Sequence, residues 1–353
     1  MRIGIHTSIA GDLTGALESA HKLGCNALQI FSASPRMWVL DGTGIAEADA
    51  ARFRARRMEL GLGPLVIHAN YLINLAASDS AMRVRSIRAF RAELLRGLAL
   101  GADFLVVHPG SGRGNDQERA ILLASQALRM ASKGTQFNQA RSHQNQTGSL
   151  RILIENTSGM GSAIGVRFEE LRSILNGAPE IPLGICLDTA HAFEAGYDIH
   201  TEQGLERTIA ALDSTVGLAR VYVVHTNDSK TPFGSRTDRH EHIGRGAIGL
   251  EAFRRMLNHP RLSARAPEGL PGRAFILETP IDVPGDDRRN VRTLWELTGL
   301  EGQQVPEAKN GFSMLRAVRK SSKKAAAKTR LKKSYRKRSK PRTRPSSRPK
   351  PRG

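Results

Sequence analysis

The chain contains the stretch VYVVH at residues 221–225, an apolar and mostly β-branched run that stops at a histidine. Runs of this kind favour buried strands. The loop that follows carries an Asp-x-His pair, Asp238 and His240. In an extended segment residues i and i+2 point to the same side, so this loop can direct a carboxylate and an imidazole at one point.

The same pattern, an apolar run that stops at a polar ligand-type residue, recurs along the chain. Stretches with apolar residues at helical spacing separate most of these runs. Alternating strands and helices predict a parallel sheet, and eight such units predict an α/β fold of the TIM (β/α)8 barrel type. The strand-like runs are residues 2–6, 26–31, 64–68, 103–108, 151–155, 183–188, 220–225 and 274–278, and the helix-like stretches include 46–60, 81–100, 116–132, 168–175, 202–216 and 250–257.

The competing architecture is a doubly wound open sheet, which would carry a G-x-G-x-x-G motif after its first strand. The glycines of GDLTG at residues 11–15 have the wrong spacing for that motif. We interpret this stretch as a turn before a helix, and the barrel is therefore the preferred fold.

Composition and charge divide the chain into a body and a tail. Hydrophobic residues make up 40% of the 353 residues, enough for a substantial core. The net charge is +20, but residues 319–353 hold 17 Lys and Arg and no Asp or Glu, which leaves +3 for residues 1–318. A segment with the composition of this tail cannot bury apolar surface. We therefore expect a barrel over residues 1–300, a linker over 301–318 and a disordered basic tail over 319–353.

Residues 133–150 are rich in Gln, Asn, Ser and Gly and predict a mobile surface insertion. No apolar run is long enough to span a bilayer, and the first residues are typical of a strand rather than of a signal peptide. Cys25 and Cys186 lie inside apolar segments, so we interpret them as buried hydrophobic residues in a reducing compartment. These features predict a cytoplasmic protein without membrane association, nucleoid-associated if it is bacterial.

Histidines and carboxylates gather where the predicted strands end. In a TIM barrel the carboxyl ends of all strands meet on one face, which holds the active site. Five imidazoles and four carboxylates are therefore expected to converge there. The nine are His68, His108, Glu155, Asp188, His191, His225, Asp238, His240 and Glu278.

A mixture of imidazole and carboxylate without thiolate suits Zn²⁺, Mn²⁺ or Fe²⁺. Nine ligands exceed the needs of one ion and suit three ions if a carboxylate bridges two of them. Cations would also offset the mutual repulsion of four carboxylates. Multi-metal sites of this kind catalyse in-line displacement at phosphodiesters. His6 also ends a strand but lacks a companion carboxylate in the sequence, so a supporting role is predicted for it, and His242 should face away from the Asp-x-His pair.

Several motifs at the strand ends resemble the endonuclease IV family of apurinic/apyrimidinic (AP) endonucleases, over roughly residues 1–300. The resemblance implies three zinc ions, with Mn²⁺ possible at one or more positions, and hydrolysis of DNA 5′ to an abasic site. It also implies removal of groups that block 3′ ends. The motifs are YLINL at 71–75, HPGS at 108–111, ENT at 155–157, DTAHAF at 188–193, HTND at 225–228, FGSRTDRH at 233–240 and LET at 277–279.

By the same resemblance, His68, His108 and Glu155 would hold the first ion. Glu155 would bridge to a second ion held by Asp188, His225 and Glu278, and His191, Asp238 and His240 would hold the third. Glu155 and Glu278 would be the catalytic carboxylates, with Glu278 also orienting the nucleophile.

Binding to damaged double-stranded DNA should involve a flipped-out nucleotide. Arg36, Tyr71 and Leu72 match positions that the family inserts into the DNA stack. The stretch Ala33-Ser34-Pro35 departs from the polar stretch expected before Arg36. The tail, which the family core does not need, is expected to bind DNA or RNA non-specifically through cations that include Lys323, Lys324, Lys332, Lys333, Arg336, Lys337 and Arg338. A monomer is expected because a duplex must reach the barrel mouth.

Two other functions fit part of the pattern. A metal-dependent sugar isomerase or epimerase on a related barrel would need one or two ions and would leave several of the nine ligands without a role. A non-catalytic nucleic-acid-binding protein would need no metal. The metal content of the protein would separate these three alternatives.

Overall fold

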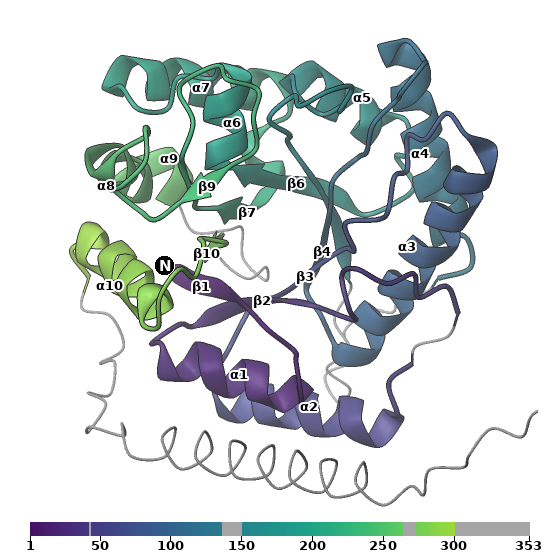
Figure 1. Cartoon of the computed structure of the whole chain (residues 1–353), viewed down its shortest axis with the longest axis horizontal. Helices are drawn as coiled ribbons and strands as arrows, with labels where there is room; N and C mark the ends of the chain where they lie inside the picture. Colours follow the sequence, from purple (N-terminus) through teal and green to yellow (C-terminus); the bar gives the residue numbers. More distant parts are fainter. Residues whose placement is uncertain (42–43, 136–149, 264–272, 301–353) are drawn as a thin grey trace, which may run out of the picture. The chain divides into compact units, whose positions relative to one another are not determined.

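Eight parallel strands close into a barrel in the computed structural model, which describes residues 1–41, 44–135, 150–263 and 273–300. The strand order around the ring is β1-β10-β7-β6-β5-β4-β3-β2. Figure 1 looks down this ring and shows the helices arranged around it. The predicted TIM barrel is confirmed.

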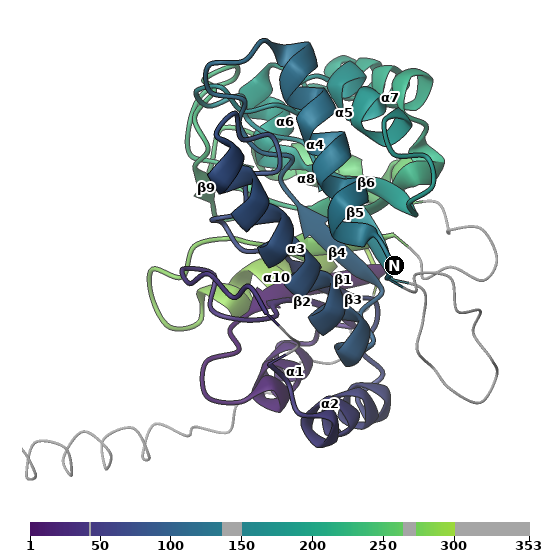
Figure 2. The same ribbon diagram turned by 90° about the vertical axis from the view of Figure 1, so that its right-hand side faces the viewer.

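Each of the eight predicted strand runs corresponds to a barrel strand, and the bounds agree to within one residue. The strands are β1 (Arg2–Thr7), β2 (Ala27–Phe31), β3 (Leu65–His68), β4 (Phe104–Val107), β5 (Arg151–Glu155), β6 (Leu183–Asp188), β7 (Val221–His225) and β10 (Ala274–Leu277). A short antiparallel pair, β8 (Asp228–Ser229) and β9 (His240–Glu241), lies in the long connection after β7. In the side view of Figure 2, β9 lies at the opposite end of the barrel from the amino terminus.

The helices that surround the barrel include every predicted helical stretch. The sequence patterns did not predict α6, α9 or α10. The helix after GDLTG begins inside that stretch, where the Asp12 carboxylate accepts a hydrogen bond from Thr14 N at 3.2 Å. The helices are α1 (Leu13–Lys22), α2 (Glu47–Glu59), α3 (Ser80–Leu100), α4 (Gln117–Ser132), α5 (Phe168–Asn176), α6 (Thr189–Ala195), α7 (Glu202–Thr215), α8 (Leu250–Asn258), α9 (Pro260–Ser263) and α10 (Asp286–Thr298), with a 3₁₀ turn at Leu218–Arg220.

The strands are apolar on both faces because both faces are buried. One set of side chains, contributed by strands alone, fills the barrel interior: Ala27, Val66, Phe104, Val106, Leu153, Cys186, Val223, Ala274 and Ile276. Their neighbours along each strand, such as Leu65 and Ile67, pack toward the helices instead. Cys25 and Cys186 are buried free thiols, as predicted, and burial raises the pKa of Cys186 to about 12.

The predicted linker and basic tail, and all but the edges of the predicted 133–150 insertion, lie outside the described residues. Among the helices of the described part of the chain, none is both long and apolar enough to cross a membrane.

Candidate metal centre

The alternation of side chains along the strands places the predicted ligands on the barrel axis. Successive side chains of a strand point to opposite faces, so a residue two positions beyond an interior residue also faces the interior. His68 follows interior Val66 in this way, and Glu155 follows Leu153. The same two-residue step leads from Val106, Cys186, Val223 and Ile276 to His108, Asp188, His225 and Glu278.

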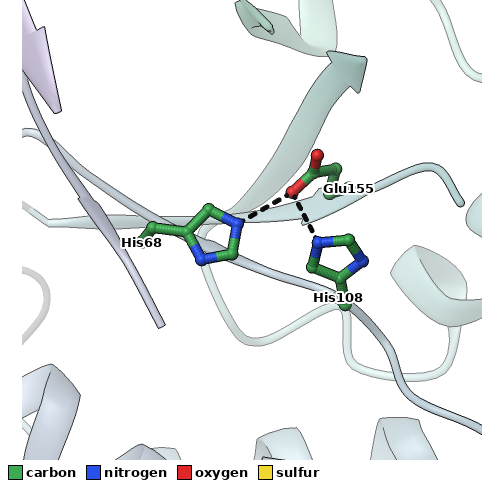
Figure 3. A group of neighbouring side chains, drawn as sticks. All are labelled: His68, His108 and Glu155. Atoms are coloured by element: carbon green, nitrogen blue, oxygen red, sulfur yellow. Dashed lines mark hydrogen bonds and ion pairs between the residues drawn. The ribbon is translucent and has the colours of Figure 1, made fainter. Parts of the chain in front are cut away.

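The first group of ligands surrounds one oxygen of Glu155, which is fully buried. Glu155 Oε2 lies 3.2 Å from His68 Nε2 and 3.3 Å from His108 Nε2, as Figure 3 shows. His68 Nδ1 lies 2.8 Å from the carbonyl oxygen of Ala69, which can only accept a hydrogen bond. Nδ1 of His68 therefore carries a proton, and Nε2 of the neutral ring presents a lone pair toward Glu155.

The second group uses the other oxygen of Glu155. His225 Nδ1 lies 2.9 Å from Glu155 Oε1, 3.2 Å from Glu278 Oε2 and 3.8 Å from Asp188 Oδ2. Ligand atoms of these four residues lie within 4.8 Å of one another. Glu155 thus takes part in two adjacent groups of side chains.

The third group lies where α6 begins and where the β7–α8 connection returns to the barrel. Asp188 caps α6 by accepting a hydrogen bond from His191 N at 2.8 Å, which places His191 beside the strand end. His191 Nε2 lies 3.2 Å from Asp238 Oδ2, and His240 Nε2 lies 3.6 Å from Asp238 Oδ1. Asp188 also approaches this group, 3.8 Å from His240 Nε2. All nine predicted ligands are therefore brought together at one end of the barrel.

Opposite charges in the centre offset the cost of burying carboxylates. Burial by itself raises the pKa of Glu155, but the nearby charges of His108 and His225 and hydrogen bonds from histidines hold it well below its usual range. Burial has the same effect on Asp238, and hydrogen bonding and charge from His191 outweigh it, lowering the pKa of Asp238 to about 2.

Burial lowers the pKa of His191, but Asp188, Asp238 and Glu155 raise it well above its ordinary value. Glu155 and Asp238 thus stay ionised and need positive partners. His240 Nε2 is buried without a hydrogen-bond partner among the described residues. A cluster of imidazole nitrogens and carboxylate oxygens without thiolate has the donor atoms that divalent ions such as zinc bind.

A cavity of about 430 Å³ opens onto the ligands. Tyr71 stands at its edge, with 67% of its surface exposed and its ring 5.1 Å from that of Phe31 between centroids. Burial of the hydroxyl and the charges of Glu278 and Glu155 raise the pKa of Tyr71 to about 12. The cavity is lined by His6, Phe31, His68, Tyr71, His108, His191, Asp238, Arg239, His240, Glu278 and Thr279.

The loops that carry the predicted DNA-binding residues are joined to each other. Asn70 Nδ2 donates to the carbonyl oxygens of Ser34, at 3.1 Å, and Met37, at 2.7 Å, and Asn70 Oδ1 accepts from Leu72 N at 2.7 Å. Arg36, between Ser34 and Met37, is exposed. The two loops therefore form one rim beside the cavity despite the departure at residues 33–35.

Sequence reasoning missed several polar residues that hold the ligands. Asn227 Nδ2 donates to Asp188 Oδ2 at 2.7 Å, and Asn227 Oδ1 accepts from Glu278 N at 2.8 Å. Asn156 Oδ1 accepts from Asp188 N at 2.6 Å. Asn156 and Asn227 lie just after the ends of β5 and β7, and this position in the sequence could have identified them as neighbours of the ligands.

His6 and His242 have carboxylate neighbours that the sequence does not reveal. The prediction that His6 lacks a companion carboxylate is wrong, because Glu278 Oε1 lies 3.3 Å from His6 Nδ1 once β1 pairs with β10. His242 faces away from the centre, as predicted, with Nε2 3.2 Å from Asp282 Oδ2.

Comparison with known proteins agrees with this fold. A family model described as a xylose isomerase-like TIM barrel matches residues 17–294, so the chain belongs to that class of barrel. A probable endonuclease 4 of Solibacter usitatus is 50% identical over 305 residues, covering 85% of this chain and 97% of the relative. One from Chloroflexus aurantiacus is 39% identical, covering 84% and 98%.

Among solved structures, endonuclease IV from Thermus thermophilus matches with a TM-score of 0.70 and 40% identity, covering 85% of this chain and 99% of that one. The chain belongs to the endonuclease IV family. A D-tagatose 3-epimerase-like protein matches with a TM-score of 0.56 at 18% identity and shares the fold alone.

Proposed function

We propose that this protein is a DNA-repair AP endonuclease. It hydrolyses the phosphodiester 5′ to an abasic site, leaves a 3′-hydroxyl and a 5′-deoxyribose phosphate, and removes groups that block 3′ ends. The observation that carries the proposal is the convergence of nine imidazole and carboxylate side chains at one end of the barrel, six of which line one cavity, in a chain of the endonuclease IV family. It acts as a monomer in the cytoplasm, on damaged duplex DNA.

We assign the nine ligands to three zinc ions, with Mn²⁺ able to replace zinc at one or more positions. His68, His108 and Glu155 hold the first ion, and Glu155 with Asp188, His225 and Glu278 holds the second. His191, Asp238 and His240 hold the third. Divalent ions at such positions activate water and neutralise the charge of a phosphodiester.

Side chains around the ligands position the substrate and the attacking water. Glu278 Oε1 is fixed by the Gln29 amide, at 2.5 Å, so Oε2 remains turned toward the centre and orients the attacking water by accepting its hydrogen bond. Tyr71 and Leu72 enter the base stack of the duplex, and Arg36 fills the gap left by the flipped nucleotide. The exposed ring of Tyr71, at the edge of the cavity, suits this role.

Cleavage of a duplex that carries a single abasic analogue tests the proposed function. We expect cutting immediately 5′ to the analogue, no cutting of the matched intact duplex, and loss of cutting after treatment with a chelator. Adding Zn²⁺ alone should restore cutting. A parallel sample that receives Mn²⁺ in place of Zn²⁺ tests whether Mn²⁺ can replace zinc. Cutting that is equal before and after chelation would contradict metal-dependent catalysis.

The metal content of the purified chain separates the alternatives. About three equivalents are expected for the endonuclease. One or two, with turnover of a ketose or aldose in place of DNA, would favour a sugar isomerase or epimerase. None would favour a protein that only binds nucleic acid.

The basic tail of residues 319–353 is proposed to tether the enzyme to DNA and to bind RNA non-specifically. A chain that ends after Leu315 should keep its turnover of abasic DNA and bind DNA more weakly. The slope of log affinity against log salt should become shallower, by about 0.9 for each phosphate that the tail no longer neutralises. Binding titrations over a salt series measure both effects, and equal affinities of the two chains at low salt would refute the tether.

A further inference from the structure

Gln29 is a polar side chain inside the barrel that the ligand set does not use. It lies on β2 two residues after interior Ala27, so it faces the barrel axis, and it is fully buried. Its amide reaches residues from three other parts of the ring: His225 at the end of β7, Glu278 after β10, and His6 on β1.

The hydrogen bonds of Gln29 leave only one orientation for its amide. Gln29 Nε2 lies 2.5 Å from Glu278 Oε1, and a carboxylate oxygen can only accept. The amide nitrogen must therefore face Glu278, which turns Gln29 Oε1 toward His225 Nε2 at 2.8 Å. An amide oxygen also only accepts, so Nε2 of His225 carries a proton.

This proton decides which nitrogen of His225 can bind a metal ion. With Nε2 protonated, the lone pair of the neutral ring is on Nδ1, the atom 2.9 Å from Glu155 Oε1 and 3.2 Å from Glu278 Oε2. His68 has the opposite arrangement, because Ala69 O holds its Nδ1 and leaves Nε2 toward Glu155. If both histidines held an ion, His68 would do so through Nε2 and His225 through Nδ1.

We propose that Gln29 is a positioning residue that selects the Nδ1-binding tautomer of His225 and fixes Glu278 for the same ion. This inference rests on the proposed function, in which His225 and Glu278 are ligands. An apolar side chain of the same length would leave the buried Nε2–H of His225 without its Gln29 partner, and Glu278 Oε1 would lose its shortest hydrogen bond and keep His6 Nδ1 at 3.3 Å. Both ligands would then lose their fixed orientation.

The first experiment measures the tautomer in the full-length wild-type chain loaded with Zn²⁺ alone. Two-bond ¹H–¹⁵N spectra of histidine rings should assign to His225 a protonated Nε2 and a zinc-bound Nδ1, and to His68 the reverse. The His225 signals are identified by their loss in His225→Gln. A His225 ring protonated at Nδ1 would overturn the inference without the need for a Gln29 variant.

The second experiment compares the zinc affinity of Gln29→Met with that of wild type, by competition with a chromogenic chelator and by zinc counts after gel filtration. Loss of an outer hydrogen-bond partner of metal ligands typically costs about 10- to 100-fold in metal affinity. One zinc equivalent should weaken by that factor while the others are retained. Ile30→Val is the matched control, because Ile30 is the next residue on β2, fully buried, and faces the helices.

The outcomes distinguish this inference from the proposed function. Zinc affinity of Gln29→Met within twofold of wild type would overturn the role of Gln29 and leave the metal centre intact. An equal loss in Ile30→Val would show that β2 stability, and not the amide, controls binding, and would overturn it too. A wild-type chain that took up no zinc would overturn the metal centre and the inference with it.

Discussion

Glu155→Gln is expected to lower cleavage of abasic DNA by at least roughly a thousandfold. The carboxylate is fully buried, with one oxygen toward His68 and His108 and the other toward His225. An amide keeps the shape but replaces one of these oxygens by a donor. A metal centre supplies several kcal/mol of charge stabilisation in the transition state, and each 1.36 kcal/mol is a factor of ten in rate.

Single-turnover cleavage of a duplex with one abasic analogue measures this loss, together with zinc counts on the same sample. Glu170→Gln provides the matched control. Glu170 is also buried, and it lies on α5, the helix that follows β5. Its Oε2 accepts a hydrogen bond from Gly165 N at 2.7 Å, and Glu170 is not one of the nine candidate ligands. A cleavage rate of Glu155→Gln within tenfold of wild type would contradict a catalytic role for Glu155.

Asp228→Ala is expected to lower the free energy of unfolding by at least about 3 kcal/mol. Its side chain is fully buried and accepts hydrogen bonds from five backbone N–H groups, and each buried donor left without a partner costs about 1–3 kcal/mol. Burial raises the pKa of Asp228, and the backbone N–H donors offset part of that rise. The donors are Ser229 and Ile248 at 2.9 Å, Gly244 at 2.9 Å, Gly246 at 3.0 Å and Gly249 at 3.4 Å.

Urea denaturation followed by circular dichroism measures this effect. Asp116→Ala is the control, because exposed Asp116 accepts one backbone N–H, from Arg119 at 2.7 Å, at the start of α4. Loss of such a cap costs about 1 kcal/mol. The two variants should therefore differ clearly, and an Asp228→Ala chain no less stable than Asp116→Ala would show that the segment after β9 does not depend on this carboxylate.

The fold and the convergence of the nine candidate ligands could be predicted because both depend on the same local pattern. A strand buried on both faces is a continuous apolar run, and the first polar residue that ends it stands out, as His68 and His225 do. In a TIM barrel the carboxyl ends of all strands lie on one face. These polar residues are therefore predicted to lie close together even when no contact between them is known. The barrel followed from eight apolar runs, and the convergence of the candidate ligands followed from the polar residues that end six of them.

The sequence did not reveal the contacts between residues that only the closure of the barrel brings together. Glu278 lies 272 positions from His6, and only the pairing of β1 with β10 makes them partners. Gln29 interrupts an apolar strand and looks like a polar residue out of place until His225 is seen across the interior. Helix α10 is rich in charged residues. It has few apolar residues, such as Val291 and Leu294, so the helical spacing of apolar residues is hard to recognise in its sequence.

The last barrel strand, β10, completes both the cylinder and the ligand set. It lies between β1 and β7, and Glu278 follows it directly. A polypeptide still being translated, before this strand leaves the ribosome, has an open seam and an incomplete cage of ligands. We therefore expect a chain that stops before β10 to lack nuclease activity, because it lacks both the strand that closes the ring and Glu278.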